Sequence, residues 1–369
     1  MKPYRTMIHL PNMLLIGAAE RHVGKTELAC AFIARHRLER EIVGIKVTTE
    51  SDRGAAGEPY EISDEAAAPP GKDTGRLLAA GAARVFHLTA RRERLGQGIT
   101  ELLKIVGQGS LLICESNSLR HEVVPGVFLM VRRKDSGNCK PSAAEVMKFA
   151  DRVVLFDGRK QDIDPDRIQI PDGRWIFPIE ANAVILAGGK SSRMGADKSL
   201  LSLAGRPLIQ HLHAQLHGTF GRILVSVGSE NRFPFLDGAL PVFDAAPGLG
   251  PLGGILAALE ASDRDLNFIV ACDIPEVPLF LVRRLVAGAA DCDCVIPVSA
   301  AGHPEPLFGI YRKSLIGPIR EALASGRRAV KDLFERVRVH YLPLDQATAL
   351  RNLNTRDDFQ NFLQEQRHA

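Results

Sequence analysis

The sequence has few of the features that mark membrane, secreted or nucleic-acid-binding proteins. None of its apolar runs approaches the roughly 18 residues of a membrane span, and residues 1–11 lack the long apolar core of a signal peptide. The six cysteines are scattered without a Cys-x-x-Cys pair, and the net charge is only +4. We therefore expect a reduced cytoplasmic protein that acts on small anions, with no nucleic acid or membrane as partner.

The remaining composition is typical of a globular protein with two domains. Hydrophobic residues make up 45% and charged residues 24% of the chain, which is usual for globular proteins. Its 369 residues are too many for one ordinary hydrophobic core. Charges, prolines and the only tryptophan cluster between Asp157 and Glu180. We place the boundary there, which predicts domains at residues 1–176 and 177–369.

Both halves alternate short apolar runs with helical patterns. This alternation predicts an α/β fold in which two mainly parallel sheets are each wrapped by helices. The expected strands are 13–17, 42–47, 84–87, 111–114, 126–131, 152–156, 183–186, 222–227, 267–271, 294–297 and 307–311. The expected helices are 25–38, 75–81, 97–106, 141–149, 207–216, 253–260, 279–287, 315–324 and 356–366. The segment from Asp52 to Asp73 is rich in Gly, Pro and acids, and we expect a loop.

A glycine-rich loop follows the first strand of the second half. It reads Leu-Ala-Gly-Gly-Lys-Ser-Ser-Arg-Met-Gly-Ala-Asp-Lys, residues 186–198. Glycines leave backbone N–H groups open to phosphate oxygens, and Arg193 and Lys198 add positive charge. A generic turn explains two glycines but not two cations at these spacings. The loop therefore predicts binding of a nucleoside triphosphate.

Nucleotidyl transfer also needs a divalent metal, and Asp273 is the leading candidate ligand. It follows the apolar run 267–272 and so lies at the carboxyl end of a buried strand, where α/β enzymes place their sites. Carboxylate oxygens are hard ligands suited to Mg²⁺. The alternative is that Asp273 caps the helix that follows Pro278.

Asp244 ends another apolar run, residues 240–243, and precedes a segment of four glycines and two prolines at 247–254. We interpret this segment as a loop with open backbone donors before a helix. It can hold a base or a sugar, or it can be only a tight connection.

Two later segments carry polar groups suited to a second substrate. Asn352 and Asn354 alternate with Leu353, so their amides face the same way on an extended segment. Thr355 and Asp358 form a pattern like a capping box for the final helix. Glu305, between two prolines, is also a candidate for substrate binding, and a surface turn explains it equally well.

The first half contains a degenerate P-loop. Residues 13–26 read as a strand, a loop and the start of a helix, and Ala19-x4-Gly24-Lys25-Thr26 fits the P-loop template except for its first residue. Lys25 would contact the β- and γ-phosphates and Thr26 would bind magnesium, at a helix N-terminus that favours anions.

Four segments of the second half resemble the MobA family, the molybdenum cofactor guanylyltransferases, in order and spacing. They are residues 186–198, 272–275, 303–306 and 352–355, and the resemblance covers about residue 182 to the C-terminus. It implies a Rossmann-like nucleotidyltransferase that transfers GMP from Mg-GTP to the phosphate of molybdopterin, the organic part of the molybdenum cofactor. The products would be pyrophosphate and the guanine dinucleotide cofactor.

The resemblance also implies roles for individual residues. Asp273 would bind magnesium, Asp244 would contact the base or the metal, and Asn352 and Asn354 would hold the pterin. No strong general base is required because the attacking phosphate is already an anion, so Arg193, Lys198 and magnesium would act by positioning and charge compensation. The residues implied to bind the nucleotide are Leu186, Ala187, Gly188, Gly189, Arg193 and Lys198.

The first half resembles MobB, the GTP-binding partner of MobA, more distantly. The resemblance rests on Lys46 after the second strand, on residues 71–82, and on Glu115 as a metal-side acid. It implies a fold like that of P-loop NTPases. The usual histidines after Lys46 and an Asn-Lys-x-Asp guanine signature are missing, so we expect binding of a nucleotide or pterin without fast turnover.

Two alternative functions remain. One is a nucleotidyltransferase that uses CTP or a sugar phosphate; Gly188 favours GTP, because the related cytidylyltransferases usually have alanine there. The other is a non-catalytic P-loop adaptor that delivers molybdenum cofactor, and the presence of both Lys198 and Asp273 argues against it. In the favoured function the partners are GTP and the molybdenum cofactor, with molybdoenzymes or their chaperones as recipients.

Three histidines lie near the expected helix 207–216. Its core stripe is formed by Leu208, Leu212 and Leu216, so we expect the histidines to be exposed rather than functional. They are His211, His213 and His217.

Overall fold

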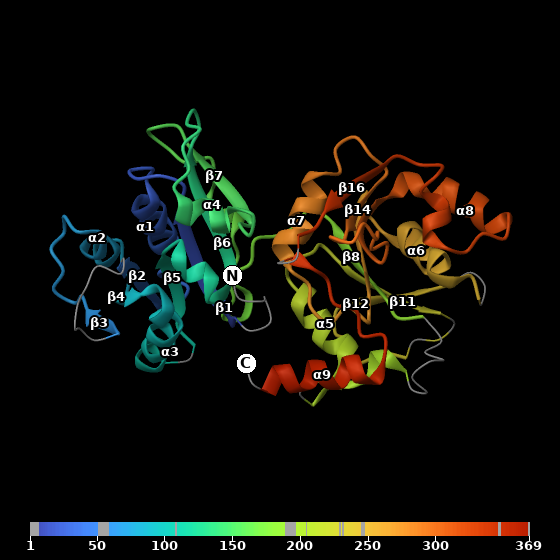
Figure 1. The fold of residues 1–369 in the computed structure, drawn as a ribbon, viewed down its shortest axis with the longest axis horizontal. Coiled ribbons are helices and arrows are strands. Elements are labelled where there is room, and N and C mark those ends of the chain that lie inside the picture. The colour runs from blue at the N-terminus through green and yellow to red at the C-terminus, as the bar shows by residue number, and fades with distance from the viewer. Residues whose placement is uncertain are drawn as a thin grey trace. The chain divides into compact units, whose positions relative to one another are not determined.

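The computed structural model describes residues 7–50, 59–107, 109–188, 197–203, 205–228, 230, 232–244, 248–345 and 348–367. The chain divides into two compact units, Met1–Phe177 and Pro178–Ala369, called unit 1 and unit 2 below (Figure 1). Each unit is an α/β domain built on a seven-stranded sheet, and the fold class predicted from the sequence is confirmed.

Unit 1 has the strand order β3-β4-β2-β5-β1-β6-β7. Neighbouring strands are parallel except for β3 and β4. The strands are β1 (Ile8–Ala18), β2 (Ile42–Glu50), β3 (Tyr60–Asp64), β4 (Arg84–Arg91), β5 (Leu111–Glu115), β6 (Val123–Arg133) and β7 (Arg152–Phe156). The helices are α1 (Lys25–His36), α2 (Asp73–Ala79), α3 (Leu95–Val106) and α4 (Pro141–Met147).

The core of unit 1 follows from its apolar patterns. The second half of β1, residues 13–18, is buried on both faces, as expected of a central parallel strand covered by helices. The buried face of α1 includes Leu28 and Phe32, and it packs on the sheet together with Leu77 of α2. Trp175 covers the end of this core, with its ring edge-on to Phe32 at 6.3 Å between centroids.

One expectation for unit 1 is wrong. The segment from Asp52 to Asp73 was expected to be a loop, but it contains β3, which pairs antiparallel with β4 at the edge of the sheet. Only part of each β3 side chain is buried. A short, half-exposed edge strand between Pro- and Ala-rich flanks lacks the continuous apolar run that marks the inner strands.

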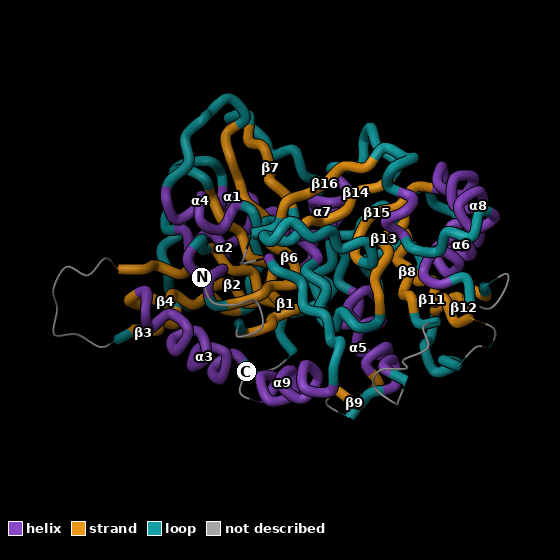
Figure 2. The backbone as a smooth tube through the Cα atoms, turned by 45° about the vertical axis from the view of Figure 1, so that its right-hand side comes forward, coloured by secondary structure: helices purple, strands orange, loops and turns teal. Residues whose placement is uncertain are grey.

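Unit 2 has the strand order β12-β11-β8-β13-β15-β14-β16, with β15 antiparallel to both neighbours (Figure 2). The seven strands are β8 (Asn182–Leu186), β11 (Ile223–Gly228), β12 (Ala239–Phe243), β13 (Leu266–Ala271), β14 (Cys294–Val298), β15 (Phe308–Arg312) and β16 (Val339–Pro343). A separate two-stranded sheet joins β9 (Ser202–Leu203) and β10 (Arg206–Pro207). The helices are α5 (Leu208–Leu216), α6 (Gly250–Ala261), α7 (Leu279–Ala287), α8 (Ile316–Ala324) and α9 (Arg356–Arg367).

The strand order of unit 2 creates a switch point beside β8. The chain steps from β8 outward to β11 and β12, and then returns to place β13 on the other side of β8. Open α/β sheets bind ligands at the carboxyl ends of strands at such a point. Helices α6 and α8 lie side by side and share a hydrophobic core with the sheet (Figures 1 and 2).

Other expectations for unit 2 need correction. The strands β12 and β16 at the two edges of the sheet were not predicted. Residues 240–243 were noted only as an apolar run before Asp244, and β16 is too exposed to show the continuous apolar pattern of an inner strand. His213 was expected to be exposed but is buried, because the buried face of α5 is wide enough to include it; burial lowers the pKa of His213. His217 is exposed, and His211 is partly exposed.

Helix α6 also begins earlier than expected. The segment 247–254 was interpreted as a loop, but residues 250–254 form the first turns of α6, with Pro251 in the first turn. Proline is favoured there, because its fixed φ suits a helix and its missing N–H is not needed. Residues 245–247 lie outside the described part of the chain.

Within the described residues, no helix combines the length and the hydropathy that crossing a membrane would require.

The contact between Phe32 and Trp175 gives a test of the unit 1 core. We expect Phe32→Ala to lower the free energy of unfolding of unit 1 by about 3–5 kcal/mol, because it leaves a cavity among buried side chains. Trp175 is the only tryptophan, so its fluorescence during urea denaturation reports this unit. Leu38→Ala is the control, because Leu38 is 91% exposed; an equal loss in both variants would contradict the assignment.

Candidate active site of unit 2

The candidate site begins where β8 and β13 end side by side. The two strands are parallel and in register, with Leu186 opposite Ala271. Beyond the last pair, the Cys272 N–H donates to the Leu186 carbonyl at 3.2 Å. The start of the glycine-rich loop and Asp273 therefore leave the sheet at the same edge. Helix α7 is capped at Pro278, so Asp273 is not its N-cap.

Lys198 and Asp273 form the charged centre of this edge. Lys198 Nζ lies 3.7 Å from Asp273 Oδ2, and the two side chains are 17% and 26% exposed. Burial raises the pKa of Asp273, whereas Lys198 acts to lower it. Burial also raises the pKa of Cys272 to about 12, so its thiol is neutral and is not a nucleophile. The pair therefore places one cation and one hard oxygen ligand at the switch point.

The residues predicted for the second substrate converge on the same aspartate. The Leu353 N–H donates to the backbone carbonyl of Asp273 at 2.8 Å, which fixes the Asn-Leu-Asn segment against it. Asn352 Nδ2 donates to Glu305 Oε2 at 3.5 Å. Burial raises the pKa of Glu305, and the nearby Asp273 adds to that rise. Glu305 is thus half-buried beside Asn352 and Asp273 rather than fully exposed on a turn.

Asn354 differs from Asn352. Its side chain is exposed, and its backbone N–H donates to Asp358 Oδ2 at 3.0 Å. The predicted capping box is confirmed, since Thr355 N–H donates to Asp358 Oδ2 at 2.8 Å and Asp358 N–H donates to Thr355 Oγ1 at 3.1 Å. The structure therefore brings Asn352 to the charged centre and places Asn354 at the start of α9.

A second group of polar atoms lies on the β11 side of the glycine-rich loop. Ser226 Oγ donates to Asp244 Oδ1 at 3.5 Å, and burial raises the pKa of Asp244. A Cβ atom on Gly188 would lie 3.4 Å from Gly228 N and 3.7 Å from Ser226 Oγ. Gly188 and Asp244 therefore flank the same serine. Of the other predicted loop residues, Gly189 and Arg193 lie outside the described part of the chain.

Sequence reasoning missed two residues that position these segments. Arg232 Nη2 donates to the Ala187 carbonyl at 2.8 Å, and its Nη1 pairs with Asp197. Gln215 Nε2 donates to the Pro275 carbonyl at 2.8 Å, and its Oε1 accepts from Val277 N–H at 3.0 Å. Arg232 thus joins both described ends of the glycine-rich loop, and Gln215 holds the turn after Asp273.

The P-loop of unit 1 forms a separate candidate site. Gly24 adopts φ 75°, a left-handed conformation that favours glycine, directly before α1. Thr26 Oγ1 donates to Glu115 Oε2 at 3.1 Å, and Lys25 Nζ lies 3.5 Å from the same oxygen. Within the described residues, neither unit has a group of three or more His, Cys, Asp or Glu side chains arranged to hold a metal.

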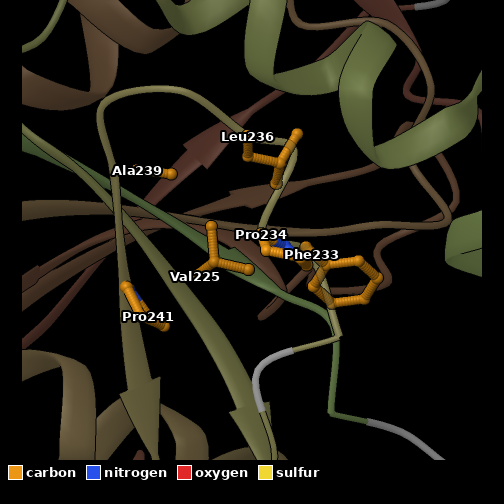
Figure 3. A pocket seen from close by; sticks show the side chains of 6 residues that line it. All are labelled: Val225, Phe233, Pro234, Leu236, Ala239 and Pro241. Atoms are coloured by element: carbon orange, nitrogen blue, oxygen red, sulfur yellow. The ribbon is translucent and has the colours of Figure 1, made fainter.

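A small pocket in unit 2 lies apart from the predicted site residues. Figure 3 shows the side chains that line it, which are apolar and uncharged. None of its lining side chains can bind phosphate or metal, so we do not assign the chemistry to it. The lining residues are Val225, Phe233, Pro234, Leu236, Ala239 and Pro241.

The close approach of α6 to Ser226 gives a test of this geometry. A Cβ atom on Gly254 would lie 2.5 Å from Ser226 Oγ, so we expect Gly254→Ala to lower the free energy of unfolding by about 1–3 kcal/mol. Removing the hydroxyl with Ser226→Ala should recover most of that loss. The matched control is Gly317→Ala in α8, which meets no atom within 4 Å and should stabilise by up to about 1 kcal/mol. Equal effects at both glycines, measured by urea denaturation, would contradict the packing.

Comparison with known proteins agrees with the geometry of unit 2. Residues 183–340 match the family model described as a MobA-like NTP transferase domain. A probable molybdenum cofactor guanylyltransferase of Carboxydothermus hydrogenoformans is 36% identical over 187 residues, covering 48% of this chain and 93% of the relative. A molybdenum cofactor guanylyltransferase of Vibrio parahaemolyticus is 31% identical over 193 residues, covering 50% of this chain and 96% of the relative.

A solved structure shows a similar match. The molybdopterin-guanine dinucleotide biosynthesis protein A of Archaeoglobus fulgidus is 26% identical, with a TM-score of 0.44, and the match covers 50% of this chain and 97% of that one. All three relatives are matched over nearly their whole length. On the strength of the two curated relatives and the family model, the chain belongs to the MobA-like NTP transferase family.

Proposed function

We propose that unit 2 transfers GMP from GTP to the terminal phosphate of molybdopterin, releasing pyrophosphate and forming the guanine dinucleotide cofactor. One observation carries the proposal: the described ends of the glycine-rich loop, Asp273 and the Asn352–Glu305 pair lie together at the switch point of the sheet, with Lys198 beside Asp273. The names of the similar guanylyltransferases agree with it.

The nucleotide would occupy the β8 and β11 side of the site. We assign phosphate binding to the backbone N–H groups of residues 186–189 and to the cations Arg193 and Lys198. Asp244, held by Ser226, would face the base. A carboxylate can accept from the ring N–H and amino group of guanine together, and cytosine lacks that pair of donors. Asp244 and Gly188 therefore both favour GTP over CTP.

A divalent cation would bind at Asp273, and we propose Mg²⁺. The donor set fits, because Mg²⁺ prefers oxygen and is commonly held by one or two carboxylates together with substrate phosphates. When bound, the cation would neutralise charge on the phosphates and on the departing pyrophosphate.

The residues of this chain would act on two anions that repel each other. A phosphate oxygen of molybdopterin attacks the α-phosphorus of GTP, and the bond from that phosphorus to the bridging oxygen of the β-phosphate breaks. Both groups are already deprotonated, so no side chain needs to take a proton. Lys198 would compensate the developing charge, and Asn352, at the charged centre, would orient the pterin.

Unit 1 would bind a nucleoside triphosphate at Gly24, Lys25 and Thr26. The specific observation in favour is the P-loop geometry, with a left-handed Gly24 before α1 and the Thr26 hydroxyl bonded to buried Glu115. Like MobB, this unit would assist the transferase. The recipients of the finished cofactor would be cytoplasmic molybdoenzymes or their chaperones.

The substrate assignment is tested by supplying molybdopterin, Mg²⁺ and each of the four nucleoside triphosphates in turn. We expect pyrophosphate and a dinucleotide product with GTP only. Turnover with CTP alone would overturn the guanine assignment, and turnover with a sugar phosphate but not with molybdopterin would overturn the acceptor.

The metal assignment is tested at Asp273. We expect Asp273→Ala to lower kcat by about a thousandfold, because a bound cation supplies several kcal/mol of charge stabilisation. Asp291→Ala, at an exposed aspartate, should leave kcat unchanged. Near-normal turnover of Asp273→Ala at saturating Mg²⁺ would contradict the assignment.

The raised pKa of Asp273 predicts how metal binding depends on pH. Only the ionised carboxylate binds a cation, so affinity should fall with decreasing pH, and at a higher pH than for an ordinary aspartate. Lys198→Ala removes the group that lowers this pKa and should move the midpoint further upward. Mn²⁺ titrations from pH 4 to pH 8 measure both midpoints. A midpoint that moved downward in the variant would contradict the coupling.

A further inference from the structure

Unit 1 contains a group of four charged side chains and one threonine that the transfer reaction does not use. We call it the Thr26 cluster, and it consists of Lys25, Thr26, Lys46, Asp73 and Glu115. The members come from the start of α1, the middle of β2, the start of α2 and the end of β5. Glu115 is opposite Ile16 on β1 and opposite Lys46 on β2 in the sheet register. The topology therefore gathers these residues beside the phosphate loop.

Thr26 lies between two carboxylates of this cluster. Its Oγ1 donates to Glu115 Oε2 at 3.1 Å, and Lys25 Nζ is 3.5 Å from the same oxygen. On the other side, Lys46 Nζ pairs with Asp73 Oδ2. The pKa of Asp73 is lowered, chiefly by its hydrogen bond with Lys46, with smaller contributions from Thr26 and Lys25. Asp73 is thus close to both P-loop side chains.

The second carboxylate oxygen of Glu115 indicates that a ligand binds here. Glu115 is 0% exposed, and within the described residues its Oε1 has no hydrogen-bond partner. A buried charged oxygen without a hydrogen-bond partner is unfavourable. Lys25 and Thr26 both contact the other oxygen, Oε2. A bound cation that reached Glu115 Oε1 would give this oxygen a partner.

We propose that Asp73, together with Glu115, is a carboxylate ligand for a divalent cation bound with a nucleoside triphosphate at the P-loop. Lys46 is the counter-ion of Asp73 while no cation is bound. The proposal rests on the proposed nucleotide binding of unit 1. Its ligand class is a magnesium–nucleoside triphosphate, since a threonine hydroxyl, one or two carboxylates and phosphate oxygens are the donors that Mg²⁺ accepts. Lys46, once released, would lie near the phosphates.

The competing explanation is structural. Asp73 is the first residue of α2, where a carboxylate stabilises the helix N-terminus, and its pair with Lys46 would then only fasten α2 to β2. The two explanations differ for Lys46→Met. If the pair is only structural, replacing Lys46 and replacing Asp73 should have the same effect on nucleotide binding. If Asp73 is a metal ligand, only the Asp73 variants lose a ligand.

The experiment measures GTP binding in the full chain carrying Arg193→Ala, Lys198→Ala and Asp273→Ala, which removes both cations and the metal ligand that we assign to the site of unit 2. Equilibrium dialysis gives the GTP affinity in saturating Mg²⁺ and in EDTA, and the ratio of the two is the magnesium dependence. We expect Asp73→Asn to lower this ratio by at least about tenfold, and Lys46→Met to leave it unchanged or raise it. Asp73→Ser is a second variant without the carboxylate, and thermal unfolding checks that each variant is folded.

Asp64→Asn is the matched control, because Asp64 forms an exposed ion pair with Arg84 in the same unit, at 2.9 Å. Lys25→Ala distinguishes failure of the proposed nucleotide binding at the P-loop from failure of the proposed role of Asp73. Binding that survives Lys25→Ala would contradict the P-loop function itself. Binding that is lost in Lys25→Ala but keeps its magnesium dependence in both Asp73 variants would overturn the role of Asp73 alone. An equal fall in Asp73→Asn and Lys46→Met would also overturn it, in favour of the structural pair.

Discussion

The parallel pairing of β8 with β13 is the constraint on which the site of unit 2 depends. Leu186 is opposite Ala271, so the glycine-rich loop and the turn that carries Asp273 begin next to each other. Lys198, at the far end of the loop, then reaches Asp273, and the Leu353 N–H binds the Asp273 carbonyl. A shift of one residue in this register would turn alternate side chains to opposite faces and separate these groups.

Both units place a lysine beside the carboxylate that we assign to a cation. In unit 2 the pair is Lys198 with Asp273, and in unit 1 it is Lys46 with Asp73. A half-buried carboxylate is costly without a counter-charge, and lysine supplies one while no cation is bound. In the proposed functions, the arriving nucleotide brings phosphates that give each lysine a new anionic partner. The same physical arrangement would then serve a transferase in one unit and a binding site in the other.

Sequence patterns predict most accurately the buried strands and the site residues that lie within contiguous motifs. The inner strand β13 was predicted as 267–271 and spans Leu266–Ala271, whereas β1 was predicted from residue 13 and begins at Ile8, because His9, Pro11 and Asn12 interrupt its apolar pattern. The edge strands β3, β12 and β16 are half-exposed and were missed. Lys198 and Asp273 were found because contiguous motifs carry them. Arg232 and Gln215 were missed, because each acts through contacts 35 to 62 residues away that leave no local pattern. The roles of all these residues remain predictions.

The most direct test of the account is the position of the metal. A crystal structure of the full chain with Mn²⁺ and a non-hydrolysable GTP analogue locates Mn²⁺ by its anomalous scattering. The account predicts a peak in unit 2 between the Asp273 carboxylate and the triphosphate, with Lys198 turned from Asp273 toward the phosphates. A nucleotide bound in unit 2 with Mn²⁺ elsewhere, and with Lys198 still paired to Asp273, would contradict it.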